Sequence, residues 1–108
     1  MAIVIAEVTF SPLGTATPSL SKYVAAAVSV LDDHPEVKHQ LNPMGTVLEG
    51  ERADIIRVVE AMNEAIFEAG ALRVGTSLKI DERRDKTASM DHKVETVLEQ
   101  ISRTSGKS

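Results

Sequence analysis

The stretch LNPMGTVLEG, Leu41 to Gly50, decides the fold because it joins two strand-like segments by a tight turn. Asn42, Pro43 and Gly45 occupy the first, second and fourth places of a type I turn, where an Asx side chain, proline and glycine are favoured. The flanking segments, VKHQLN (37–42) and GTVLEG (45–50), read as short strands. We therefore predict a β-hairpin, whose Thr46 and Glu49 either belong to its framework or line a binding site.

Regular elements are also predicted on both sides of this hairpin. Residues 3–10, IVIAEVTF, are rich in β-branched side chains and predict a strand, and residues 72–83, LRVGTSLKIDER, predict another. Apolar residues at helical spacing predict three helices, one starting at Thr17-Pro18, one ending at Gly70 and one starting near Ser89. Their apolar stripes are Leu20, Val24, Ala27 and Leu31; Ile55, Val59, Met62 and Ile66; and Met90, Val94, Val97 and Ile101.

The order strand, helix, strand, strand, helix, strand is that of an α+β, ferredoxin-like βαββαβ sandwich, here with an additional C-terminal helix. Right-handed crossovers would place the first and third strands in the centre of an antiparallel sheet, with both main helices on one face. We expect one domain over residues 1–103 and a flexible tail over residues 104–108.

Composition excludes several classes of function. The net charge of −4 and the three aromatic residues argue against a nucleic-acid partner. There is no cysteine, and the three histidines lack the spacing of a zinc site, so we expect no metal. No apolar run approaches the ~18–20 residues that span a membrane, and the first ten residues lack a basic leader. We therefore expect a cytoplasmic protein without a membrane partner.

The predicted topology gathers polar residues from remote parts of the chain at one end of the sheet. The end of the first strand, the start of the first helix and the hairpin turn meet there, which brings Ser11, Thr17, Ser19, Asn42 and Thr46 together. The start of a helix adds unpaired backbone N–H groups. Each residue alone is explained by capping or turn formation, but their convergence favours a binding site.

The other face of the sheet is predicted to carry Ile3, Ile5, Glu7 and Thr9, since side chains alternate along a strand. Burying the two isoleucines would contribute about 1.5–3 kcal/mol each. Another subunit or the extra helix is therefore expected to cover this face. A glutamate at its border could recognise a cation by charge-assisted hydrogen bonds.

Three segments resemble the small single-domain thiamine-binding family related to YkoF: EVTFSPLGTATPSLSKYV (7–24), LNPMGTVLEGE (41–51) and RVGTSLKIDERRDK (73–86). The resemblance covers about residues 2–100. It implies a ferredoxin-like fold, a homo-oligomer (dimer or tetramer) built by sheet packing, and binding of thiamine or its hydroxymethylpyrimidine part without catalysis. The role implied is thiamine transport, salvage or sensing, and no cofactor beyond this ligand is implied.

Thiamine presents an aminopyrimidine edge, a cationic thiazolium and a hydroxyethyl tail. On this resemblance the candidates to hydrogen-bond the aminopyrimidine edge are Ser19, Asn42 and Thr46, with Ser11 as a further candidate. The candidate to pair with the cation is Glu49, and Glu7 is able to share that role. Glu49 lies about 10 Å along the strand from Thr46 at ~3.3 Å per residue, so it serves either the ligand or a subunit interface.

Two alternatives stay open. One is a structural or regulatory homo-oligomeric module that binds another small metabolite. The other is an acylphosphatase-like enzyme, which would need an Arg-bearing phosphate loop directly after the first strand, whereas SPLGTATPS (11–19) contains no Arg or Lys. The same loop lacks the lysine of a P-loop.

Overall fold

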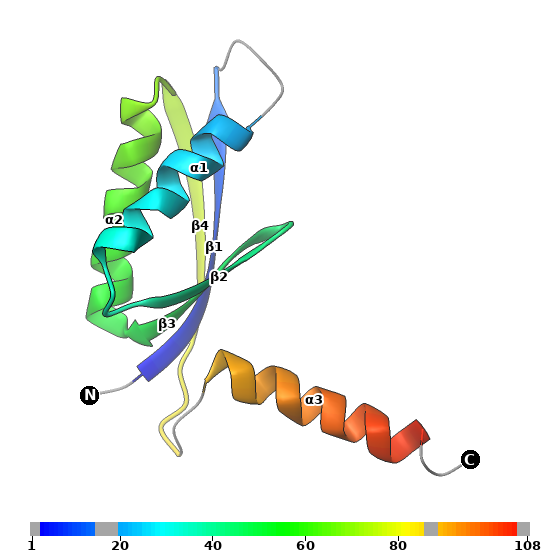
Figure 1. Ribbon diagram of the computed structural model, residues 1–108. Helices are drawn as coiled ribbons and strands as arrows, with labels where there is room; N and C mark the ends of the chain where they lie inside the picture. Colours follow the sequence, from blue (N-terminus) through cyan, green and yellow to red (C-terminus); the bar gives the residue numbers. More distant parts are fainter. Residues whose placement is uncertain (1–2, 15–19, 86–88, 106–108) are drawn as a thin grey trace.

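The computed structural model describes residues 3–14, 20–85 and 89–105, and its elements follow the predicted order (Figure 1). The strands are β1 Ile3–Leu13, β2 Lys38–Asn42, β3 Gly45–Glu51 and β4 Arg73–Asp81, and the helices are α1 Ser21–Ser29, α2 Arg52–Glu68 and α3 Met90–Ser105, with the 3-10 turn η1 Val30–Asp33 after α1. The predicted helix start at Thr17-Pro18 lies outside the described residues.

The four strands form one antiparallel sheet in the order β2-β3-β1-β4, so the first and third strands are central as predicted. β1 pairs with β4 as far as Leu13, but its pairing with β3 ends at Val8, opposite Thr46. Beyond Val8, the β3 side of β1 therefore has no partner among the described strands. This unpaired edge of β1 lies next to the hairpin turn.

The hydrophobic core lies between the sheet and the helices α1 and α2, which cover one face (Figure 1). β1 contributes Val4, Ala6 and Val8, and Phe10 packs at its edge, as the alternation predicted. The four residues of the predicted α2 stripe are all buried: Ile55, Val59, Met62 and Ile66. Gly70 follows α2 with φ 115°, a conformation that suits glycine at a helix end.

The predicted stripe of α1 needs a correction at its first turns. Ala27 and Leu31 are buried, but Leu20 and Val24 are partly exposed and the ring of Tyr23 is buried instead. The helix is therefore rotated so that Tyr23 packs into the core. Val24 is left facing a hollow that other elements do not fill.

Among the described residues, the start of α3 covers the opposite face of the sheet at one place. Met90 packs on Ile5 and Val47, and its backbone N–H donates a hydrogen bond to Glu49 Oε1 at 3.0 Å. Two ion pairs join the same end of α3 to the sheet, from Lys38 to Asp91 and from Lys93 to Asp81.

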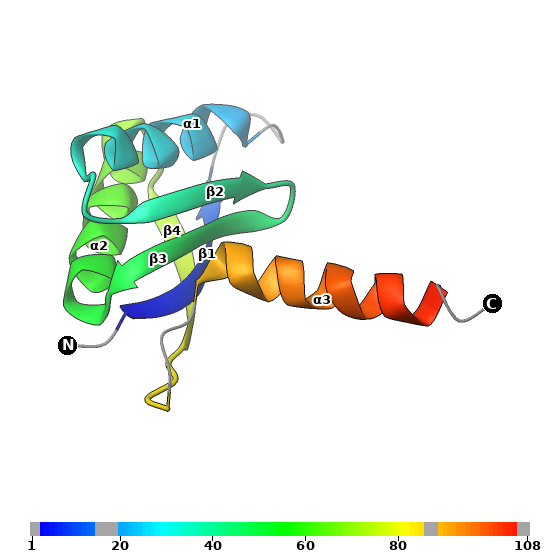
Figure 2. The same ribbon diagram turned by 60° about the horizontal axis from the view of Figure 1, so that its bottom comes forward.

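Beyond this attachment α3 projects away from the body (Figure 2). Its remaining apolar side chains, Val94, Val97, Leu98 and Ile101, are between 55% and 58% exposed. The radius of gyration is 16.4 Å, whereas a compact domain of this length would have about 13 Å. The extra helix thus covers Ile5, which was one of the two predicted ways to cover this face. It leaves Ile3 partly exposed, and the apolar stripe of α3 itself stays uncovered.

Candidate functional site

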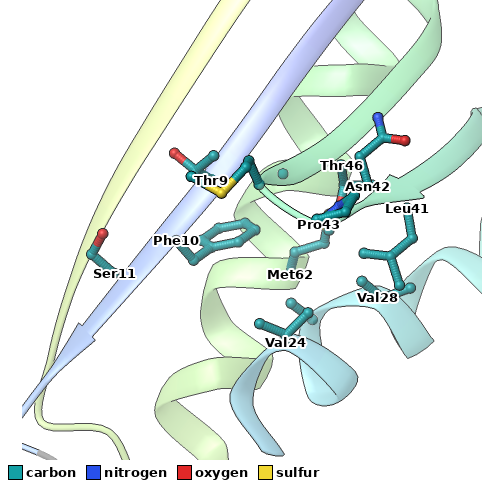
Figure 3. Close-up of a pocket in the computed structure, with 13 residues that line it drawn as sticks. Thr9, Phe10, Ser11, Val24, Val28, Leu41, Asn42, Pro43, Thr46 and Met62 are labelled. Carbon is teal, nitrogen blue, oxygen red and sulfur yellow. The ribbon is translucent and has the colours of Figure 1, made fainter. Parts of the chain in front are cut away.

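A cavity of about 420 Å³ opens beside the unpaired edge of β1 (Figure 3). We call it the hairpin cavity. Four segments build it, namely the last part of β1, the face of α1 that Val24 occupies, the turn between β2 and β3 with the strand residues beside it, and α2 through Met62. Its lining residues are Thr9, Phe10, Ser11, Val24, Ala27, Val28, Leu41, Asn42, Pro43, Met44, Gly45, Thr46 and Met62.

The interior of the hairpin cavity is apolar. Figure 3 shows the Phe10 ring, Met62 and Val24 facing one another across it, with Val28 and Leu41 beside them. None of the described residues that line it carries a charge. A slot of this kind suits a flat, largely apolar ring, and its volume lies in the usual range for small-ligand sites, about 300–1,000 Å³.

Thr46 is the buried polar residue of this cavity. Its side chain is on the helix-facing side of β3, together with Leu48, and is only 5% exposed. Within the part of the chain that the structure describes, its hydroxyl makes no hydrogen bond. Its oxygen is not sealed in the core and keeps access to the cavity, so the Thr46 hydroxyl offers a donor and an acceptor to a molecule there.

The rim of the cavity is polar, as predicted from the topology. Ser11 and Asn42 both line it together with Thr46. The Asn42 amide, however, points away from the interior (Figure 3), and its Oδ1 accepts a hydrogen bond from Gln40 Nε2 at 3.2 Å. Ser19, the fourth residue predicted there, lies outside the described residues.

Glu49 and Glu7 are placed on the other face of the sheet. Thr46 and Glu49 are an odd number of residues apart, so their side chains point to opposite faces. Glu49 accepts the hydrogen bond from Met90 N–H at the start of α3, and Glu7 lies opposite Val47 on the same face. The structure therefore brings Ser11, Asn42 and Thr46 to one cavity but does not bring either glutamate to it.

Sequence reasoning missed the apolar walls of the cavity. Phe10 and Met62 looked like ordinary core residues, and Val24 was assigned to the core stripe of its helix. A signal did exist at the hairpin, since Leu41 and Met44 flank the turn as large apolar residues and are both exposed. Such residues beside a turn are typical of a site where a ligand or partner covers them.

The charged groups whose pKa values shift are remote from the cavity. A hydrogen bond from Lys93 lowers the pKa of Asp81, and the bond between Lys38 and Asp91 raises the pKa of that lysine. Both pairs hold α3 to the sheet. Arg84 likewise lowers the pKa of Glu82 in the loop after β4.

Among the described residues, no three His, Asp or Glu side chains are grouped as a metal site would require. The helices of this part of the chain also include none with the length and apolarity to cross a bilayer.

Comparison with known proteins identifies relatives along nearly the whole chain. A family model described as "Thiamine-binding protein" matches residues 6–98. A UPF0045 protein of Methanothermobacter thermautotrophicus is 47% identical over 100 residues, which cover 92% of this chain and 100% of that protein.

Solved structures share the fold. The hypothetical protein MJ1052 of Methanocaldococcus jannaschii superimposes with a TM-score of 0.82 at 38% identity, covering 90% of this chain and 97% of the other. A Thermotoga maritima protein whose name refers to thiamine biosynthesis or salvage superimposes with a TM-score of 0.73 over 88% and 98% of the two chains. Its identity of 20% makes that likeness one of fold alone.

Proposed function

Since this chain belongs to the thiamine-binding protein family, we propose that it binds thiamine, or the hydroxymethylpyrimidine part of thiamine, in the hairpin cavity and releases it unchanged. The observation that carries the proposal is the combination of an apolar slot with the unpaired hydroxyl of Thr46, a residue that is otherwise buried and lines the slot. The role that follows is thiamine transport, salvage or sensing. A cytoplasmic location remains part of this proposal.

The aminopyrimidine ring fits the chemistry of the slot. Its flat faces would pack between Phe10, Met62 and Val24, while its donor and acceptor edge would meet the Thr46 hydroxyl. The unpaired edge of β1 beside the cavity can add backbone N–H and C=O groups, as exposed strand edges do. Ser11 and Asn42 at the rim, and Ser19, complete the set of hydrogen-bonding residues that we propose for the ligand.

Titration calorimetry with thiamine and with hydroxymethylpyrimidine tests the proposal. We expect micromolar or tighter binding to the wild-type chain. Val24→Phe would fill the slot and should abolish binding, and Ile56→Phe is a matched control because both side chains are 39% exposed on a helix and Ile56 does not line the cavity. Absence of heat with every thiamine species, or equal binding by both variants, would refute this site.

Two other functions compete with this one. An acylphosphatase-like enzyme needs a cationic group at the end of β1, and the uncharged lining of the cavity favours binding over phosphoryl chemistry. A structural or regulatory module that binds another metabolite would use the same cavity. A ligand screen that includes uncharged heterocycles beside thiamine discriminates between the two binding hypotheses.

We also propose that the chain forms a homo-oligomer through the sheet face that lacks α1 and α2. The start of α3 occupies part of this face, so the contact would include the α3 stripe as well as the sheet. Burying Val94, Val97, Leu98 and Ile101 would stabilise a dimer or tetramer by roughly 1.5–3 kcal/mol for each side chain fully covered.

A further inference from the structure

A second hollow adjoins the hairpin cavity on the outer side of α1. It has a volume of about 440 Å³ and is lined by Ser21, Val24, Ala25, Val28, Ser29, Asp32 and Leu41. We call it the α1 groove. Val24, Val28 and Leu41 line both hollows, so they separate two parts of one continuous apolar surface.

The hairpin cavity does not account for binding of the charged half of the proposed ligand. The thiazolium half of thiamine is permanently cationic, yet the lining residues that the structure describes are all uncharged. Glu49 and Glu7, the carboxylates that the sequence suggested, lie on the opposite face of the sheet. A carboxylate for the cation must therefore come from another place next to the cavity.

Asp32 meets this requirement. It lines the α1 groove, is exposed to solvent, and takes part in no ion pair within the described residues. It lies in η1 at the C-terminal end of α1, where neither segment has a basic residue in its last turn. Unpaired carbonyl groups at a helix C-terminus add to the negative potential, so this end of the groove favours a cation.

The spacing along the helix fits a ligand with two rings. Asp32 follows Val28 by one turn, about 6 Å at ~1.5 Å per residue. Val28 itself borders the hairpin cavity. A ligand whose first ring occupies that cavity can therefore pass Leu41 and place a second, charged ring within reach of Asp32.

On the basis of the proposed function, we infer that the α1 groove is a second subsite, which takes the cationic half of the ligand, with Asp32 as its counter-ion and Leu41 between the two rings. The hairpin cavity alone then binds the neutral pyrimidine. The groove adds affinity for molecules that carry a positively charged ring.

Calorimetry on the full chain with two ligands tests the inference. The ligands are thiamine and hydroxymethylpyrimidine, at a pH where the pyrimidine is uncharged. The variants are Asp32→Asn and, as a matched control, Asp33→Asn, since Asp33 is the next residue of η1, is also exposed, and does not line the groove. Melting curves establish that each variant is folded.

We expect Asp32→Asn to weaken thiamine binding by about 1.4- to fivefold, the effect of one exposed charge pair, and to leave pyrimidine binding unchanged. Asp33→Asn should change neither. Added salt should weaken thiamine binding by the wild-type chain more than by Asp32→Asn, because screening acts on the charge pair.

Equal thiamine affinity of Asp32→Asn and the wild-type chain would overturn the second subsite and leave the proposed function standing. An equal loss of affinity for thiamine and for hydroxymethylpyrimidine would also overturn the second subsite, since the aspartate would then act on the cavity as a whole. A wild-type chain that binds neither ligand would refute the proposed function itself, and the subsite with it.

Discussion

Thr46→Val should move stability and ligand affinity in opposite directions. Thr46 is 5% exposed, and valine keeps the shape of its side chain while removing a hydroxyl that has no hydrogen-bond partner within the described residues. Leaving a hydroxyl without a partner in an apolar environment costs about 1–3 kcal/mol. The cost is smaller here because the hydroxyl keeps access to the cavity. The free energy of unfolding should therefore stay the same or rise by up to about 1 kcal/mol, which corresponds to about 4–8 °C in Tm.

The same change should weaken ligand binding. A hydrogen bond between the Thr46 hydroxyl and the aminopyrimidine edge would contribute about 0.5–1.5 kcal/mol, so its loss should raise Kd about two- to thirteenfold. Thermal unfolding followed by circular dichroism gives the first quantity and calorimetry with hydroxymethylpyrimidine gives the second, on the same preparation.

Thr76→Val serves as the control. The Thr76 hydroxyl on β4 donates to Asn63 Oδ1 at 2.8 Å and does not line the cavity. This variant should lose a little stability and keep the wild-type Kd. If Thr46→Val instead lowered Tm by several degrees, the hydroxyl would belong to the framework of the hairpin, and an unchanged Kd would remove Thr46 from the ligand site.

Two further predictions concern α3. Val97→Glu combined with Ile101→Glu should shift the protein to monomers in light scattering, because both changes place a charge in the α3 stripe. Ser102→Glu on the same helix should not. A wild-type chain that is already monomeric at micromolar concentration would contradict the proposed assembly. The hydrogen bond from Lys93 lowers the pKa of Asp81 below its ordinary value of 3.8, so this contact stabilises α3 attachment above that pH and the stabilisation is lost as the pH falls through the lowered pKa. Amide protection factors in the first turns of α3, which correct for the slow intrinsic exchange in acid, should therefore fall as the pH falls, and Asp81→Asn should show reduced protection already at neutral pH. Identical protection in both proteins at neutral pH would show that the pair does not hold the helix.

The order of the elements could be predicted because each rests on a local pattern. The turn residues around Pro43, the β-branched run of β1 and the four-residue stripe of α2 each specify their element without help from the rest of the chain. The order βαββαβ then leaves few topologies, and the observed sheet is the ferredoxin-like one. The convergence of Ser11, Asn42 and Thr46 followed from that topology alone.

The walls and charges of the site depend on tertiary packing, which local sequence patterns do not specify. The rotation of α1 that buries Tyr23 and turns Val24 toward the cavity is set by packing against α2 and the sheet. Alternation could have separated Glu49 from Thr46 in advance, because an odd offset along a strand changes the face. The role proposed for Asp32 depends on which groove adjoins the cavity, and that adjacency arises only from the packing of the folded chain.

The early end of the pairing between β1 and β3 has a consequence for how such a protein can change its ligand. The empty space exists because the hairpin stops short, so its size depends on the length and tilt of β2 and β3. Among the described residues, α2 contributes one lining side chain, that of Met62. A longer hairpin would extend the ladder along Thr9 and Phe10 and close the hollow, while leaving the folding core untouched. Ligand size and domain stability can therefore be varied almost independently in this architecture.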